Sequence, residues 1–207
     1  GKSPSVVLPD ADLTASIPGV ASAIFFNHGQ CCCAGSRLYV EKSIFDKVVA
    51  GVGDQAKQIK LGPGLDPSTQ MGPLVSEEQQ RRVLGYLDSG LAEGAEAVVG
   101  GKRLGDKGYF VEPTVLVKTN SNMKVIQEEI FGPVVCAEPF TNVEDVITKA
   151  NDNIYGLAAA VWTKDLSAGH RIAAQLRAGT VWINCHNIFD ASLPFGGYKQ
   201  SGWGREM

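Results

Sequence analysis

Apolar residues recur along this chain with two different spacings, which predict strands and helices that follow one another in turn. Short apolar or alternating runs predict strands at residues 6–8, 37–41, 95–99, 114–118, 134–137, 157–162 and 180–184. Apolar residues three or four positions apart predict helices at residues 18–26, 44–59, 76–93, 143–151 and 166–177. Because parallel neighbouring strands need crossover helices, this order indicates an α/β fold with a largely parallel, twisted sheet flanked by helices.

Residues near the ends of three helices help to place their boundaries. Pro18 is tolerated in a first helical turn, and Ser43 suits the N-cap of the helix that follows it. The run Ser76–Gln79 resembles a capping box, and Gly94 would end the helix that this box begins. We therefore expect these helices to begin close to Pro18, Ser43 and Ser76.

The final segment, residues 185–207, shows neither of the two spacings. It is rich in glycine, proline and aromatic residues, so we expect an extended loop after the last strand. Sites in α/β proteins usually lie in loops beyond the carboxyl ends of the strands. Residues 184–197 are therefore predicted to form one wall of a pocket.

The composition narrows the class of protein. With 207 residues, of which 44% are hydrophobic, the chain is long enough to build one core without disulfides or a metal. Charges of both signs are interspersed and the net charge is -3, so we expect no nucleic-acid partner. No apolar run approaches the ~20 residues that span a bilayer, and residues 1–10 lack a signal-peptide pattern. These features predict a cytoplasmic protein with no membrane partner.

Three of the five cysteines are consecutive, Cys31, Cys32 and Cys33, and they lie between Gly29 and Gly35. This grouping is poorly placed for a disulfide framework. A lone cysteine is usually a small buried hydrophobic residue, but a triplet between glycines favours a thiol nucleophile that faces a cavity. No Cys-x-x-Cys or paired-histidine spacing accompanies the triplet, so we expect no metal site.

The residues alone do not identify a base for such a nucleophile. The chain has three histidines, and none has a spacing that favours it: His28, His170 and His186. A Gly-x-Gly-x-x-Gly run in a strand-turn-helix context, which would predict a dinucleotide site, is absent. Spacing alone describes Glu128 and Glu129 as two exposed acids ahead of a strand.

Several blocks together carry a resemblance to a known family. Residues 25–36 (Phe-Phe-Asn-His-Gly-Gln-Cys-Cys-Cys-Ala-Gly-Ser) are similar to its cysteine signature, and residues 1–4 (Gly-Lys-Ser-Pro) to the end of its glutamate signature. Further blocks are similar to its other shared motifs: residues 129–133, 155–159, 179–184 and 194–202. The chain resembles the NAD(P)-dependent aldehyde dehydrogenases over its whole length, with the motifs in the family's order.

The resemblance implies the fold of the family's catalytic domain and a mechanism centred on Cys32. In such enzymes the thiolate attacks an aldehyde, the thiohemiacetal passes a hydride to NAD or NADP, and water hydrolyses the thioester to a carboxylic acid. The backbone N–H of Cys32 would hold the developing oxyanion. Glu129 would bind the nicotinamide ribose, Phe131 would pack beside the cofactor, and Gln79 would lie near its adenosine side.

The same alignment implies which residues line the mouth that receives the aldehyde: Cys31, Cys33, Asn187, Phe189 and Phe195. Residues 182–197 are similar to members of the family that oxidise phenylacetaldehyde, so we expect an aromatic aldehyde as substrate. Enzymes for aliphatic and betaine aldehydes share much of this stretch.

By this resemblance, residues 1–207 correspond to the catalytic domain alone. The segments that bind most of the cofactor, supply the base glutamate and form oligomers would lie outside them, so we expect the isolated chain to be inactive. The expected partners are the aldehyde, the cofactor-binding domain of the same polypeptide, and further copies in a homo-oligomer. The alternative is a non-catalytic domain that acts through its surface as an interaction or structural module.

Overall fold

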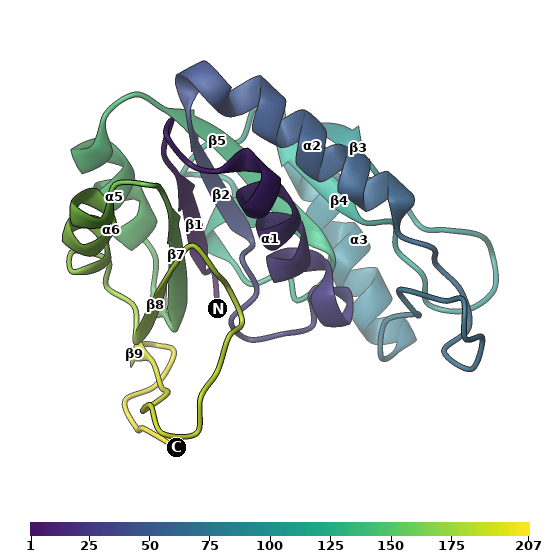
Figure 1. Cartoon of the computed structure of the whole chain (residues 1–207). Coiled ribbons are helices and arrows are strands. Elements are labelled where there is room, and N and C mark those ends of the chain that lie inside the picture. The colour runs from purple at the N-terminus through teal and green to yellow at the C-terminus, as the bar shows by residue number, and fades with distance from the viewer.

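Seven strands form one sheet in the computed structural model, which describes residues 1–207. In the order β3-β4-β5-β2-β1-β7-β8, only β3 and β4 are antiparallel. This confirms the predicted α/β fold with a mostly parallel sheet (Figure 1). The strands are β1 (Pro4–Val7), β2 (Arg37–Glu41), β3 (Glu96–Val99), β4 (Thr114–Val117), β5 (Val134–Phe140), β7 (Ala158–Trp162) and β8 (Thr180–Ile183).

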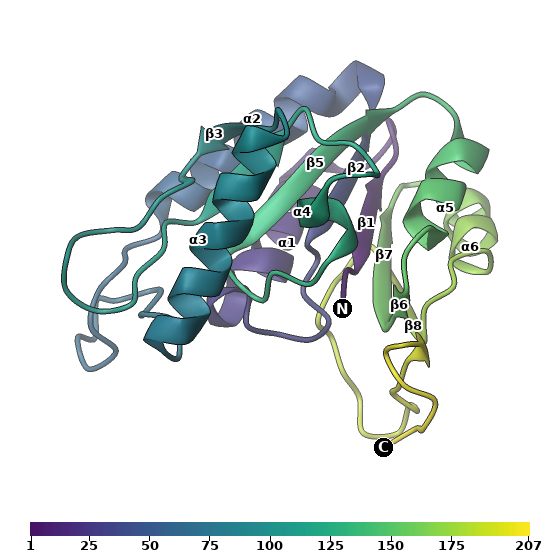
Figure 2. The same ribbon diagram turned by 180° about the vertical axis from the view of Figure 1, so that it is seen from behind.

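Helices cover both faces of the sheet. One face carries α1 (Leu13–Phe25) and α2 (Phe45–Gln58), as Figure 1 shows. The other face, seen in Figure 2, carries α3 (Glu77–Ala92), α4 (Lys124–Gln127), α5 (Val143–Asn151) and α6 (Leu166–Ala173). Side chains alternate along a strand, so Val7 packs with α1 and α2 while Val6 packs with α5 and α6.

The predicted start of the first helix is wrong. α1 begins at Leu13, where the Asp12 carboxylate accepts the Thr14 N–H at 2.9 Å as an N-cap. Pro18 lies inside the helix, and it is exposed. Its missing N–H would have bonded to the Thr14 carbonyl, and Thr14 is also exposed. Water can therefore satisfy the carbonyl that the proline leaves free.

Two further helix ends also differ from prediction. Ser43 is not the N-cap of α2, because its N–H and hydroxyl both turn back to the Glu41 carboxylate within a short 3-10 helix, η2 (Lys42–Ile44). α6 ends at Ala173 rather than Arg177, because the Asn151 side chain accepts the Arg177 N–H at 2.7 Å. By contrast, Ser76 caps α3 as predicted and accepts the Gln79 N–H at 3.1 Å.

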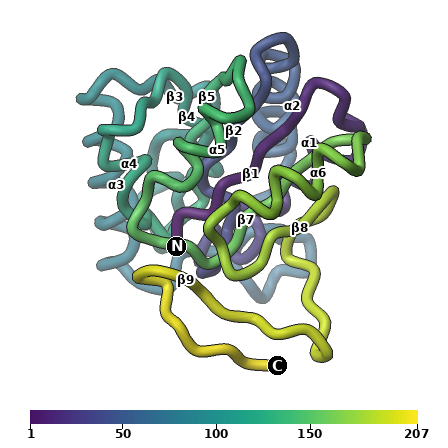
Figure 3. The backbone as a smooth tube through the Cα atoms, turned by 90° about the vertical axis from the view of Figure 1, so that its left-hand side faces the viewer, coloured from purple at the N-terminus to yellow at the C-terminus, as the bar shows by residue number.

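The C-terminal segment is mostly extended, as expected, but it contributes one strand to a pair that the sequence did not indicate. β9 (Tyr198–Lys199) pairs antiparallel with β6 (Tyr155–Gly156). A methyl group on Gly179 would lie 1.6 Å from the Gly196 carbonyl oxygen, so the segment can approach this closely only where a side chain is absent. Figure 3 shows the segment, in yellow, running beneath the N-terminus.

No helix in the structure is both long enough and apolar enough to cross a bilayer.

Candidate active site

A tight turn presents the cysteine triplet ahead of β2. The Ala34 N–H donates to the Cys31 carbonyl at 3.1 Å, so Cys32 and Cys33 are the central residues of the turn. Cys33 is buried, with 1% of its surface exposed, whereas Cys32 is exposed. All five cysteines are free thiols. The turn therefore separates one accessible thiol from a buried neighbour.

Left-handed backbone leads into this turn from the end of α1. Asn27, His28 and Gly29 have φ values of 49°, 61° and 67°. A methyl group on Gly29 would lie 2.0 Å from the Gly132 carbonyl oxygen, so only glycine fits this contact. His28 Nε2 accepts the Gly72 N–H at 2.9 Å and ties the strained stretch to the long loop before α3. Such strain persists only where the surroundings hold it in place.

His186 and Asn187, which follow β8, hold the buried Cys33. His186 Nε2 lies 2.9 Å from the Cys33 carbonyl oxygen, and Cys33 Sγ donates to Asn187 Oδ1 at 3.2 Å. Cys33 Sγ also lies 3.4 Å from Cys31 Sγ. Hydrogen bonds to Cys31 and Cys32, together with burial, raise the pKa of Cys33. Hydrogen bonds from Cys32 and Cys33 lower the pKa of Cys31. Cys33 is therefore protonated, and its single S–H donates to Asn187 Oδ1.

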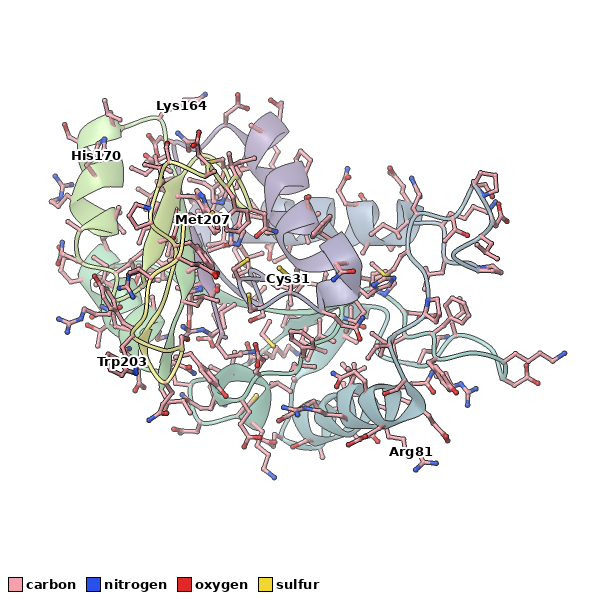
Figure 4. All side chains as sticks on the ribbon, turned by 90° about the horizontal axis from the view of Figure 1, so that it is seen from below. Cys31, Arg81, Lys164, His170, Trp203 and Met207 are labelled. Carbon is pink, nitrogen blue, oxygen red and sulfur yellow. The ribbon has the colours of Figure 1, made fainter.

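Cys32 faces a cavity of about 420 Å³. The C-terminal segment forms the facing wall, and the lining residues include Cys32, Leu157, Phe195, Ser201, Trp203 and Arg205. The Cys32 N–H donates to no acceptor in the protein. In Figure 4, Cys31 lies near the centre of the molecule and Trp203 lies toward its edge, on the C-terminal segment. The cavity thus joins an accessible thiol to an unpaired backbone donor.

Aromatic rings in edge contact support the cavity wall. The Phe189 ring packs between Trp182, at 5.4 Å, and Phe195, at 5.1 Å, with interplanar angles of 88° and 82°. Trp182 Nε1 donates to the Ile188 carbonyl at 2.8 Å and fixes this loop. Phe195 lines the cavity, Phe189 lies behind it, and Asn187 is turned toward Cys33.

The second group of predicted site residues lies on the other side of Gly1. The Gly1 nitrogen lies beside Glu129 Oε1, and a methyl group on Gly1 would lie 3.0 Å from the Cys32 carbonyl oxygen. Gln79 Nε2 donates to the Phe131 carbonyl at 2.8 Å, where Phe131 has a φ of 58°. Glu129 and Cys32 are therefore neighbours across one residue, and Gln79 supports the Glu129–Phe131 loop.

Buried bonds fix Gly1 in this position. Lys2 Nζ donates to the Val125 carbonyl at 2.7 Å, and Arg37 Nε donates to the Lys2 carbonyl at 2.7 Å. Both side chains are buried, and burial lowers the pKa of Lys2 to about 8.

The site lies at the amino ends of the parallel strands, which corrects the prediction for its position. Gly1 precedes β1, the cysteine turn precedes β2, Glu129 precedes β5, and Leu157 precedes β7. Residues 195–197 do line the cavity, because the chain turns back after β8 at Asn184, where φ is 57°. The segment that starts at a carboxyl end thus serves a site at the opposite edge.

Sequence reasoning missed the role of His186. The one signal available was its place in the predicted pocket wall, two residues after the last predicted strand. Its partner Cys33 is 153 positions away, so no local pattern could have joined them.

Comparisons with known proteins agree with this fold. The model of the aldehyde dehydrogenase family matches residues 1–207, so the chain belongs to that family. The betaine aldehyde dehydrogenase of Bacillus subtilis (strain 168) is 49% identical over 211 aligned residues, which cover all of this chain and 43% of that protein.

Solved structures match closely as well. The NAD+ complex of aldehyde dehydrogenase from Bacillus cereus superposes with a TM-score of 0.98 at 51% identity, over the whole chain and 42% of that structure. Betaine aldehyde dehydrogenase from Staphylococcus aureus in complex with NAD+ gives 0.97 at 45% identity, over the whole chain and 42% of that structure. This chain spans about two fifths of the length of the relatives that it matches.

Proposed function

We propose that this chain is the thiol-bearing catalytic domain of an aldehyde dehydrogenase that oxidises an aldehyde to a carboxylic acid with NAD or NADP. The observation that supports this proposal most strongly is the position of Cys32. This residue is exposed at the corner of a turn, lines the cavity and has a free backbone N–H. Solved structures of the Staphylococcus aureus relative include one with a BME-modified cysteine and one with the same cysteine BME-free. A reactive thiol at Cys32 is consistent with those forms.

The chemistry follows from what this thiol can do. The Cys32 thiolate adds to the aldehyde carbon, and the carbonyl oxygen becomes an oxyanion to which the Cys32 N–H donates. The resulting thiohemiacetal loses a hydride and becomes a thioester. Water then cleaves the carbon–sulfur bond, which releases the carboxylic acid and restores the thiol. NAD, when bound, accepts the hydride.

The residues present fit one end of that cofactor. Glu129 is part-exposed beside Gly1 and offers carboxylate oxygens that can accept from a ribose diol, and Phe131 lies next to it. Gln79 uses its amide N–H groups to hold the Ile130 and Phe131 carbonyls, which leaves its oxygen as the atom for a cofactor contact. We assign Glu129 and Phe131 to the nicotinamide end and Gln79 to the adenosine side.

An aromatic aldehyde such as phenylacetaldehyde is the proposed substrate. The cavity has the volume of a small-molecule site, and Phe195 presents a ring to it that edge contact with Phe189 holds in place. Cys31, Cys33 and Asn187 would shape the cavity from behind the nucleophile. Replacing Phe195 without a change in aldehyde preference would count against this assignment.

The complete enzyme would be longer than residues 1–207. Its base, its second oxyanion donor and the rest of its cofactor site would come from the same polypeptide, and we expect a homo-oligomeric cytoplasmic enzyme. Production of NADH from an aldehyde by the 207-residue chain should be negligible, and the polypeptide with its flanking sequence should be active. Cys32→Ser should abolish that activity and Cys136→Ser should not. Full activity of Cys32→Ser would overturn the proposal.

The alternative function, a non-catalytic interaction module, is favoured by one observation. Ile188, Leu193, Trp203 and Met207 of the C-terminal segment are all more than half exposed. Such apolar surface often binds a partner. Equal, slow labelling of all three adjacent thiols would support this alternative, and selective labelling of Cys32 would support the enzyme.

A further inference from the structure

His186 contacts the cysteine turn from outside the cavity. Its ring is buried against Trp182, with ring centroids 4.7 Å apart, and its Nε2 lies 2.9 Å from the Cys33 carbonyl oxygen. It does not line the cavity. The contact therefore acts on the backbone of the turn and leaves the space for a substrate untouched.

The partner atom fixes the chemical form of the ring. A carbonyl oxygen only accepts hydrogen bonds, so Nε2 must carry the proton. Nδ1 has no partner, and in the neutral ring it is the unprotonated nitrogen. Burial lowers the pKa of His186, which favours the same neutral form. His186 is thus a single donor aimed at one backbone oxygen.

The bonded carbonyl belongs to the turn that presents Cys32. Neighbouring peptide planes share the φ and ψ angles of the residue between them, so the direction of the Cys33 carbonyl constrains the Cys32–Cys33 peptide. Asn187 adds a second anchor through Cys33 Sγ. Two consecutive residues after β8 therefore hold Cys33 at both its backbone and its side chain.

We propose that His186 is a positioning residue for the thiol step, a role that rests on the proposed function. Through the Cys33 carbonyl it holds the turn in the orientation in which Cys32 lines the cavity and keeps its N–H unpaired. Attack on an aldehyde needs the sulfur and the oxyanion donor in place together, so a turn that rotates loses rate rather than substrate affinity.

A matched pair of variants tests this role in the polypeptide with its flanking sequence. Methionine and glutamine have similar length, but only glutamine can donate from the position of Nε2. We expect His186→Met to lower kcat about tenfold with the KM for the aldehyde within about twofold, because the buried carbonyl loses its donor. His186→Gln should restore most of kcat, and His170→Gln, on the exposed side of α6, should change neither constant. Equal losses in the Met and Gln variants would overturn the proposal.

A second experiment uses the 207-residue chain and does not depend on the function. Iodoacetamide labelling with peptide mapping should show the buried Cys33 reacting about tenfold faster in His186→Met than in wild type or His186→Gln, with Cys136 unchanged. An unchanged Cys33 rate would overturn the proposal even in an active enzyme. If the polypeptide with its flanking sequence has no dehydrogenase activity, the proposed function is refuted, but the role of His186 in holding the turn is not.

If neither variant folds, nitrogen NMR of the wild-type histidines decides. A neutral His186 ring with a slowly exchanging proton on Nε2 is expected, and a proton on Nδ1 would overturn the proposal.

Discussion

The two walls of the cavity around Cys32 are built in different ways. Several contacts hold the cysteine turn. Gly72 donates to His28, Gly29 packs against the Gly132 carbonyl, and His186 and Asn187 contact Cys33. The facing wall depends on a short strand pair and close glycine contacts, and its Trp203 is 95% exposed. The thiol is thus fixed by the body of the fold, whereas the facing wall can change without disturbing it.

The largest expected effect comes from replacing a glycine on the nucleophile wall. Gly29→Ala would force a side chain onto left-handed backbone and into the Gly132 carbonyl, so we expect a loss of at least about 4 kcal/mol in the free energy of unfolding. Gly204→Ala on the facing wall meets no atom within 4 Å and should cost less than about 0.5 kcal/mol. Urea denaturation of both variants measures the contrast, and equal losses would refute it.

A lysine beside each wall gives the next contrast. Burial lowers the pKa of Lys2 to about 8, and burial also lowers the pKa of Lys199. Burial disfavours the charged form of Lys2, so this side chain lowers the free energy of unfolding fully below pH 8. As the pH rises from 8 toward 10.5 the folded state loses this proton first, and the free energy of unfolding increases by about 3 kcal/mol.

Urea denaturation from pH 7 to 10 checks this sign. The free energy of unfolding of the wild type should rise with pH when that of Lys2→Met is taken as the reference. With Lys199→Met as the reference, the rise should be smaller. If the difference in the free energy of unfolding between wild type and Lys2→Met does not change with pH, burial of the Lys2 charge does not destabilise the fold as described.

If the proposed function holds, changes in the facing wall should affect substrate specificity more than the free energy of unfolding. Phe195→Ala removes the edge contact with Phe189 and the ring that lines the cavity. We expect kcat/KM of the polypeptide with its flanking sequence to fall about tenfold for phenylacetaldehyde and much less for acetaldehyde, which corresponds to about 1.4 kcal/mol of lost transition-state stabilisation. Parallel losses for both aldehydes would remove Phe195 from the specificity assignment.

The smallest effect is expected at Trp203. Its side chain is almost fully exposed, so Trp203→Ala should change the free energy of unfolding by less than about 0.5 kcal/mol. If calorimetry shows that the free energy of unfolding falls by more than about 1 kcal/mol, the facing wall is held more firmly than its contacts indicate.

The sequence was sufficient for elements whose ends depend on local patterns. The boundaries of β2 and α5 were predicted correctly, because alternation and an apolar stripe define them within one short window. The start of α1 was missed, because an exposed carbonyl lets the helix tolerate Pro18. β9 was missed because a pair of two-residue strands has no period to detect.

The candidate site was predictable only in part, for a similar reason. The Gly-flanked triplet indicated a thiol nucleophile, and the family resemblance singled out Cys32, but the residues that support this turn come from far along the chain. Glu129 lies 128 positions from Gly1, and Cys33 lies 154 positions from Asn187. Gly1 and Glu129 become neighbours because the parallel sheet places the amino ends of β1 and β5 at one edge, whereas Asn187 reaches Cys33 because the chain turns back after β8.

The most direct test of the account is the rate of alkylation at each of the three adjacent thiols. Limiting iodoacetamide on the folded 207-residue chain, followed by peptide mapping, should modify Cys32 at least about tenfold faster than Cys33, because one thiol is exposed and the other is buried and protonated. Cys31 has the lowered pKa but is half-buried against Cys33, so it should react more slowly than Cys32. Equal rates at all three thiols, or fastest reaction at Cys31, would contradict the claim that the turn presents Cys32 as the nucleophile.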